Sequence, residues 1–229
     1  MKSPAQRHYE RVSAEQAAAS AAPGESLAGA SVYELMLAKL ASDRRRLKSI
    51  ASIERKIEVK RAELLPEYVD YVAGALAGGR GAQDDILTTV MIWRVDVGDF
   101  DGALDIARYA LAHRMTLPDQ YDRPLATAIA EEFAEAALAA FKKGGTPIGV
   151  SGAQLGEVAQ LTGSADMHDQ VRAKLHKALG YVAEQGGDGK AALEHLRRAL
   201  ELDSRAGVKQ DIARIEKASN AADSNAGCT

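Results

Sequence analysis

The sequence contains two similar copies of one short stretch with a helical pattern. Residues 98–111 read GDFDGALDIARYAL and residues 187–200 read GDGKAALEHLRRAL. Aligned without a gap, the two stretches agree at seven of fourteen positions, at an offset of 89 residues. In each stretch a Gly-Asp turn leads into a run whose Ala and Leu residues recur at helical spacing. We therefore predict two helical hairpins, one around each copy.

The second copy extends backwards into a longer pattern. Residues 176–204 fit the tetratricopeptide pattern at most of its positions, including Leu179, Gly180, Ala192 and Leu196. Small residues let two crossing helices approach closely, while Leu fills the space toward the next helix. Two separated hairpins do not make an array, because a solenoid needs about three stacked units. Two interpretations stay open: packing signatures of a compact helical protein, or a groove that binds a peptide.

The composition predicts an all-α protein. Hydrophobic residues make up 46% of the 229 residues and aromatic residues 5%, and no run alternates β-branched with polar residues. No stretch approaches the ~20 apolar residues of a membrane-spanning helix, and the N-terminus lacks the apolar core of a signal peptide. The single cysteine, Cys228, cannot form an internal disulfide. We expect a cytoplasmic protein with no membrane partner.

Shifts in composition divide the chain into five expected segments. Residues 14–31 are rich in Ala, Ser and Gly, which predicts a mobile linker or a frayed helix, and the last dozen residues are small and polar. The expected segments are a flexible N-terminal segment at 1–31, a basic heptad-patterned helical region at 32–66, a helical domain with the first hairpin at 67–145, a helical domain with the second, tetratricopeptide-like hairpin at 146–217, and a disordered tail at 218–229.

The heptad-patterned region has apolar residues seven positions apart, such as Leu40 and Leu47, and an exception at Asp43. Ser42 is a candidate break between two helices, and Pro66 is the expected end of the helical run. The fold expected here is a long basic helix or a helical hairpin. Its apolar stripe is too large to stay exposed on one helix, so we expect it to pack between subunits or against a neighbouring helix.

The same region is the most basic part of a chain whose net charge is −3. Residues 39–61 hold nine Lys and Arg against three Asp and Glu. Clustered cations neutralise nucleic-acid phosphates without any particular catalytic geometry. The candidate DNA-contact residues are Arg44, Arg45, Arg46, Lys48, Arg55, Lys56, Lys60 and Arg61. The alternative is a solvated, charged face of a coiled coil.

Motifs for ATP hydrolysis and metal binding are missing. The stretch GGRGAQDD at 78–85 has glycines but no Lys followed by Ser or Thr, so we interpret it as a loop in which Gln83 or Asp84 caps a helix. The histidines form no H-E-x-x-H pattern and no Cys pair exists, so no metal site is predicted. The carboxylate doublets are Asp84 with Asp85, Glu131 with Glu132, and Asp166 with Asp169. They are interpreted as helix caps or solvated faces, and no catalytic residue is assigned.

One further segment has the spacing of a helix-turn-helix motif. Residues 153–171 place Ala159 and Gly163 at the typical positions, but Asp169 stands where an apolar residue is expected. Reading of the major groove by this segment is therefore a minor alternative.

Several long stretches of the chain resemble one known family. They read SPAQRHYERV, YELMLAKLASDRRRLKSI, KRAELLPEYV, GAQDDILTTVMIWRVDVGDFDGALDIARYAL and DMHDQVRAKLHKALG, in that order. These stretches resemble the terminase small subunit of temperate, contractile-tailed phages with cohesive-end genomes, and the resemblance extends over residues 2–215.

The resemblance implies a function and partners. Proteins of that family join a separate ATPase large subunit, recognise the packaging site on concatemeric double-stranded DNA, and are described as the endonuclease subunit; terminase small subunits generally assemble as rings. It implies a location in the cytoplasm of a bacterial host, no cofactor in this chain, and a divalent metal such as Mg²⁺ if the chain cleaves DNA. Many relatives end in a basic tail, whereas this chain ends in SNAADSNAGCT, so DNA binding is expected in the N-terminal half.

Three functional hypotheses follow. The first is a DNA-recognition subunit of a packaging terminase, oligomeric and without its own ATPase. The second is a helical-repeat adaptor that binds a protein and neither binds nor cleaves DNA. The third is an autonomous metal-dependent nuclease.

Overall fold

The computed structural model describes residues 2–118, 123–142 and 149–226, and within these ranges the regular secondary structure is helical apart from one isolated bridge between Ser26 and Gln83. The predicted all-α class is therefore confirmed. The chain divides into two compact units, Met1–Leu125 and Ala126–Thr229.

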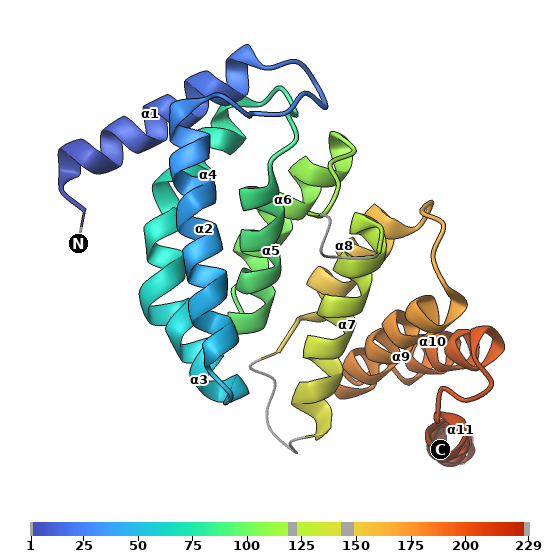
Figure 1. Cartoon of the computed structure of the whole chain (residues 1–229). Coiled ribbons are helices and arrows are strands. Elements are labelled where there is room, and N and C mark those ends of the chain that lie inside the picture. The colour runs from blue at the N-terminus through green and yellow to red at the C-terminus, as the bar shows by residue number, and fades with distance from the viewer. Residues whose placement is uncertain (1, 119–122, 143–148, 227–229) are drawn as a thin grey trace. The chain divides into compact units, whose positions relative to one another are not determined.

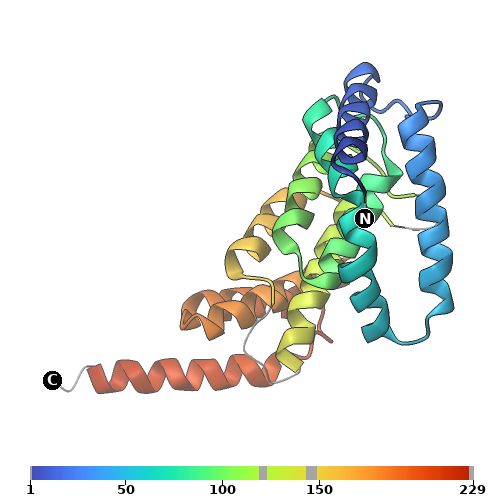
Figure 2. The same cartoon turned by 90° about the vertical axis from the view of Figure 1, so that its left-hand side faces the viewer.

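The first unit is built from six α-helices and one π-helical turn within its described residues (Figure 1). In chain order these are α1 (Pro4–Ser20), α2 (Ser31–Ser49), α3 (Ile53–Val59), the π-helical turn η1 (Lys60–Leu64), α4 (Leu65–Gly78), α5 (Asp85–Val97) and α6 (Phe100–Ala112). Helix α1 packs along α4, and α5 pairs with α6. Helix α2 contacts α1 and α5 and runs along one side of this unit (Figure 2).

Helix α1 occupies a segment for which the sequence suggests flexibility. Its buried Ala14 and Ala18 lie against Gly74 and Gly78 of α4. A Cβ added at Gly74 would lie 2.9 Å from the Cβ of Ala14, and one added at Gly78 would lie 2.6 Å from the Cβ of Ala18. The small residues that look like a linker in the sequence therefore allow two helices to pack closely.

The basic region does not break where the sequence suggests. Helix α2 continues through Ser42, and the interruption comes at residues 50–52. Pro66 lies in the first turn of α4 and, because it has no N–H, donates no helical hydrogen bond. The preceding turn is widened, because the Leu65 N–H donates to the Lys60 carbonyl five residues earlier. The chain therefore stays helical from α3 through η1 into α4.

The repeated Gly-Asp turn has the same local structure in both copies. Gly98 and Gly187 adopt φ values of 82° and 80°, in the left-handed region that favours glycine. The following Asp99 and Asp188 cap the next helix by accepting the N–H three residues further on, at 3.2 and 2.9 Å. The two predicted hairpins are confirmed as α5–α6 and α9–α10, and their assignment as tetratricopeptide units stays a prediction.

The second unit contains the remaining described helices. These are α7 (Leu125–Lys142), whose first residue ends the first unit, α8 (Gly152–Thr162), α9 (Asp169–Gln185), α10 (Gly189–Leu202) and α11 (Lys209–Ala226). Helices α9 and α10 lie side by side, and α11 packs on α10 (Figure 1). The apolar cluster beneath α10 and α11 consists of Ala192, Leu196, Val208, Ile212 and Ile215.

Several expected boundaries differ from the observed ones. The units divide after Leu125 rather than after residue 145. Helix α11 runs through residues 218–226, where the sequence suggests a disordered tail, and residues 227–229 lie outside the described residues. The connection between α8 and α9 spans residues 163–168, which is longer than the three- or four-residue turn of a helix-turn-helix. None of the described helices is both long and apolar enough to cross a bilayer.

Candidate nucleic-acid interface

The apolar stripe of α2 fixes which of its side chains face solvent. Tyr33, Met36, Leu40 and Leu47 are buried. Asp43, which interrupts the heptad pattern, is also buried. It accepts hydrogen bonds from the Tyr68 hydroxyl and the Lys39 ammonium, at 2.7 and 3.0 Å. The polar exception is thus satisfied inside the unit, and Arg45, Arg46 and Lys48 in the second half of α2 are exposed.

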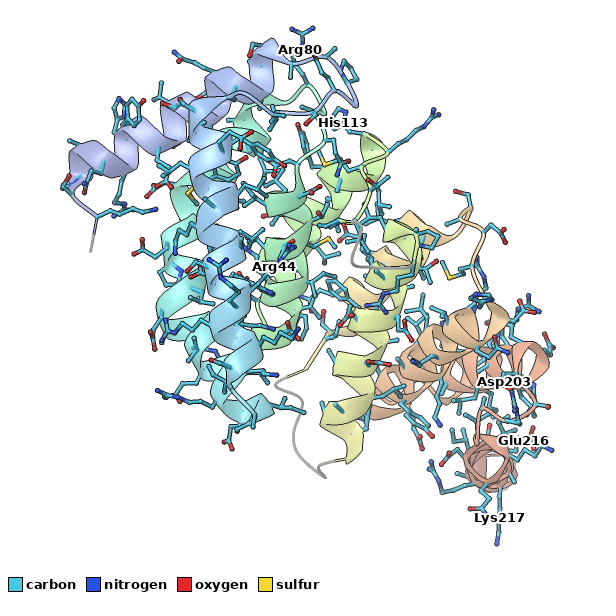
Figure 3. All side chains as sticks on the ribbon, viewed as in Figure 1. Arg44, Arg80, His113, Asp203, Glu216 and Lys217 are labelled. Carbon is cyan, nitrogen blue, oxygen red and sulfur yellow. The ribbon has the colours of Figure 1, made fainter. Side chains whose placement is uncertain are left out.

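Arg44 points inward and joins two helices. Its guanidinium donates to the Thr89 hydroxyl on α5 at 2.6 Å, and Figure 3 shows it between α2 and α5. Thr89 is fully buried, and its hydroxyl donates in turn to the Asp85 carbonyl at 2.7 Å. Arg44 therefore positions α2 on α5.

Lys60 and Arg61 attach η1 to the end of α5. The Lys60 ammonium lies 2.5 Å from an Asp96 carboxylate oxygen and 5.9 Å from the centre of the Trp93 ring, with only 13% of its side chain exposed. The Arg61 guanidinium donates to the Val97 carbonyl, which no α-helical N–H can reach at the helix end, at 2.7 Å. Both cations are therefore engaged within the protein.

Two further candidates form exposed ion pairs. Arg46 pairs with Glu63, and Arg55 pairs with Glu58 on its own helix. About half of each arginine side chain is exposed, at 46% and 56%. Exposed ion pairs of this kind contribute only about 0–1 kcal/mol. These two arginines could exchange their carboxylates for phosphates at little cost.

The remaining three candidates have no hydrogen-bond or ion-pair partner among the described residues. They are Arg45, Lys48 and Lys56, named here the free cation trio. Arg45 and Lys48 are exposed and three residues apart on α2, so they share one face, and Lys56 is half-exposed on α3. Charges that no protein group neutralises are the ones best able to bind phosphates.

The glycine-bearing loop ahead of α5 ends in a helix cap. Asp84 is fully buried. Its carboxylate accepts hydrogen bonds from the N–H groups of Ile86 and Leu87 at 2.9 and 3.0 Å, and from the Tyr71 hydroxyl at 2.7 Å. The predicted cap at Asp84 is confirmed. Burial and, to a smaller extent, the charge of the neighbouring Asp85 raise the pKa of Asp84 to about 6, although the three hydrogen bonds act in the opposite direction.

The other carboxylate doublets lie in helices of the second unit or beside them. Glu131 accepts the Lys174 ammonium at 2.9 Å, and Asp169 is the first residue of α9. Within residues 2–118, 123–142 and 149–226, no three or more His, Cys, Asp or Glu side chains gather in a group that could hold a metal ion. No catalytic residue is assigned from these positions.

Comparison with known proteins decides the family. The family model described as "Phage small terminase subunit" matches residues 37–170, more than half of the chain. The chain belongs to this family. This small terminase subunit is 51% identical over 218 residues to the "Terminase, endonuclease subunit" of Escherichia phage P2, with 95% of the chain and 85% of that protein aligned.

The "Probable terminase, endonuclease subunit" of Haemophilus phage HP1 is 25% identical over 100 residues, or 44% of this small terminase subunit and 36% of that protein. No solved structure matches.

The family match covers all eight candidate cations, but the structure separates their roles. Sequence reasoning missed Thr89, Asp96 and Glu63. These residues accept hydrogen bonds from Arg44, Lys60 and Arg46, respectively. These partners lie between 17 and 45 residues away in the chain, so no local pattern could reveal them. The long-range fold therefore decides which cations of this small terminase subunit stay available.

Proposed function

We propose that this small terminase subunit recognises the packaging site of a phage with cohesive ends and delivers double-stranded DNA to a separate ATPase large subunit. The observation that carries the proposal is the free cation trio, since three cations without protein partners lie within the region that matches the family. The 51% identity to a terminase endonuclease subunit over nearly the whole chain supports the same assignment.

The trio is suited to the phosphate backbone rather than to bases. Each Lys or Arg that neutralises a phosphate releases a condensed counterion, so affinity falls steeply with salt. Such contacts fix register and orientation and carry no sequence information directly. Recognition of the packaging site then depends on other contacts or on DNA shape, while Arg45, Lys48 and Lys56 supply the general affinity.

Cleavage and assembly belong to the same proposal. Because the P2 and HP1 relatives are named endonuclease subunits, we propose that this chain contributes to cutting concatemeric DNA in the host cytoplasm, as a homo-oligomer and with a divalent metal such as Mg²⁺. Hydrolysis of ATP is assigned to the large subunit, because the glycine loop at 78–85 serves as the lead into the cap of α5.

The test of DNA recognition is a mobility-shift assay at two salt concentrations. Purified protein is mixed with a duplex that carries the cohesive-end site and with a scrambled duplex of equal length, at about 50 and 200 mM salt. The proposal expects tighter binding to the site duplex at both concentrations and a large loss of affinity for both duplexes at the higher salt. Absence of binding to either duplex at low salt would overturn it and favour the protein-binding adaptor.

Cleavage and the large subunit are tested separately. The cohesive-end duplex is incubated with Mg²⁺ and the small subunit alone, and then together with the ATPase large subunit. The proposal expects that cleavage at the site depends on the small subunit and that the two subunits co-purify. Site-specific cutting by the large subunit alone would remove the endonuclease contribution from this chain without affecting DNA recognition.

A further inference from the structure

Two histidines face one another across the α9–α10 hairpin. The Nδ1 atoms of His176 on α9 and His195 on α10 are 3.2 Å apart, with ring centroids at 5.4 Å and ring planes inclined by 38°. Both side chains are half-buried. They border a hollow of about 470 Å³ on the surface of the hairpin. The DNA-binding proposal uses neither residue.

The ring nitrogens of the two histidines can act as metal ligands through their lone pairs. A neutral imidazole carries one ring proton, which can reside on Nδ1 or on Nε2. When both histidines carry it on Nε2, both Nδ1 lone pairs point into the gap between the rings.

The separation of the two nitrogens matches that of two ligands on one metal ion. Imidazole nitrogens bind Zn²⁺ at about 2.0–2.1 Å, and two of them at the tetrahedral angle are about 3.3 Å apart. The observed separation is 3.2 Å. A single N–H···N hydrogen bond between the rings is also compatible with this distance, and it would give way to the ion by a tautomeric shift that releases no proton.

We propose that His176 and His195 form a two-histidine site for a transition-metal ion that prefers nitrogen ligands, with Zn²⁺ as its representative. Water from the adjoining hollow fills the remaining coordination positions, so the site is open rather than closed by protein. The bound ion joins α9 to α10 and stabilises the hairpin that contains the second copy of the repeated turn. A hard ion such as Mg²⁺ prefers oxygen ligands and is not accepted.

The surrounding charges set the strength of the site. Arg198 and Arg172 oppose a cation, but Arg198 is paired with Glu201 at 2.9 Å, and Arg172 donates to the carbonyl oxygen of Ala165 at 2.8 Å. Glu194 and Glu201 border the same hollow and partly offset the positive charge. With two protein ligands and this mixed environment, the site binds metal more weakly than a closed structural zinc site does.

The experiment is a melting curve of the untagged full chain with and without ZnCl₂, with MgCl₂ as the comparison ion. A ligand that binds only the folded protein raises the melting temperature, and saturating zinc should raise it by roughly 2–8 °C. Isothermal titration should give one zinc ion per chain. His176→Gln and His195→Gln should each lose the zinc-dependent rise, whatever their melting temperatures without metal, because each removes one of two ligands.

A matched control is His8→Gln, since His8 is exposed and has no hydrogen-bond or ion-pair partner among the described residues. This variant should keep the full response to zinc. Three results would each overturn the proposal: no response to zinc in the parent, an equal response in the parent and the two ligand variants, or an equal response to Mg²⁺. The first of these would leave the histidine pair as a hydrogen bond alone.

Discussion

Replacing Gly74 by Ala should weaken the packing of α1 on α4. A Cβ at this position would meet the carbonyl oxygen of Arg11 and lie 2.9 Å from the Cβ of Ala14. Neither contact belongs to the far end of a flexible side chain, so the two helices must separate by a few tenths of an ångström or more. Overpacking of this kind typically costs about 1–3 kcal/mol.

The intrinsic helix preference of Ala acts in the opposite direction and must be removed by a control. Gly156, inside α8, has nothing within 4 Å of an added Cβ. Gly156→Ala should therefore gain the ~0.5–1 kcal/mol by which Ala exceeds Gly in a helix, with no steric cost. The difference between the two variants isolates the packing of α1, and we expect Gly74→Ala to be less stable by about 1–3 kcal/mol.

Two measurements report this difference. In thermal unfolding, about 1–3 kcal/mol in a unit of 125 residues corresponds to a shift of roughly 4–12 °C. Hydrogen exchange then shows whether the amides of α1 lose protection before the rest of the first unit. If Gly74→Ala has the same melting temperature as Gly156→Ala, and if the amides of α1 keep their protection from hydrogen exchange, then α1 does not pack on α4 as described.

Three further variants test other contacts. Ala192 is fully buried where α10 crosses α9, so Ala192→Leu should lower the free energy of unfolding by about 1–3 kcal/mol in chemical denaturation. Ala126→Leu, at a half-exposed position, should have a smaller effect. Equal effects of the two substitutions would argue against the close crossing. Asp84 has a pKa raised from 3.8 to about 6, so its charge opposes folding above pH 6 and this penalty disappears as the pH falls toward 4. Asp84→Asn keeps a capping oxygen and should be more stable than the parent at pH 7, with an advantage that shrinks on acidification; an advantage independent of pH would contradict the assignment. Arg44→Ala removes the hydrogen bond to Thr89 and should lower the urea midpoint by an amount equivalent to about 1–2 kcal/mol while leaving the salt dependence of DNA binding unchanged; a flatter dependence would place Arg44 on the DNA.

The local features of the fold could be predicted from the sequence because each has a short-range cause. The repeated Gly-Asp turns follow from the left-handed glycine and from the aspartate side chain that caps the next helix. The cap at Asp84 follows from the same chemistry. Ser3 and Gln6 also form a capping box at the start of α1, which a search of the first residues for helix signals could have found.

The features that could not be predicted depend on contacts between distant segments. An Ala-rich stretch is equally compatible with a linker and with a close helix contact, and only Gly74 and Gly78, some sixty residues away, make α1 a packed helix. Distant contacts also decide which cations of the candidate interface are available to DNA. Eight cations in one basic run look equivalent in sequence, whereas acceptors such as Thr89 and Asp96 engage some of them and leave the free cation trio available.

The most direct test of DNA binding by the free cation trio is the dependence of affinity on salt in a triple variant. Arg45, Lys48 and Lys56 are replaced together by Ala, and the matched control replaces Lys190, Lys209 and Lys217, which are exposed cations of the second unit, so that both variants lose the same charge. Each phosphate contact contributes about 0.9 to the slope of log affinity against log salt.

The account predicts that the first variant binds the cohesive-end duplex more weakly at low salt, with a slope reduced by about 2–3 per bound subunit, while the control keeps the slope of the parent. Unchanged melting temperatures would show that both variants fold. If the trio variant keeps the parent's slope, or if the control loses as much, the surface of α2 and α3 is not where this small terminase subunit holds DNA.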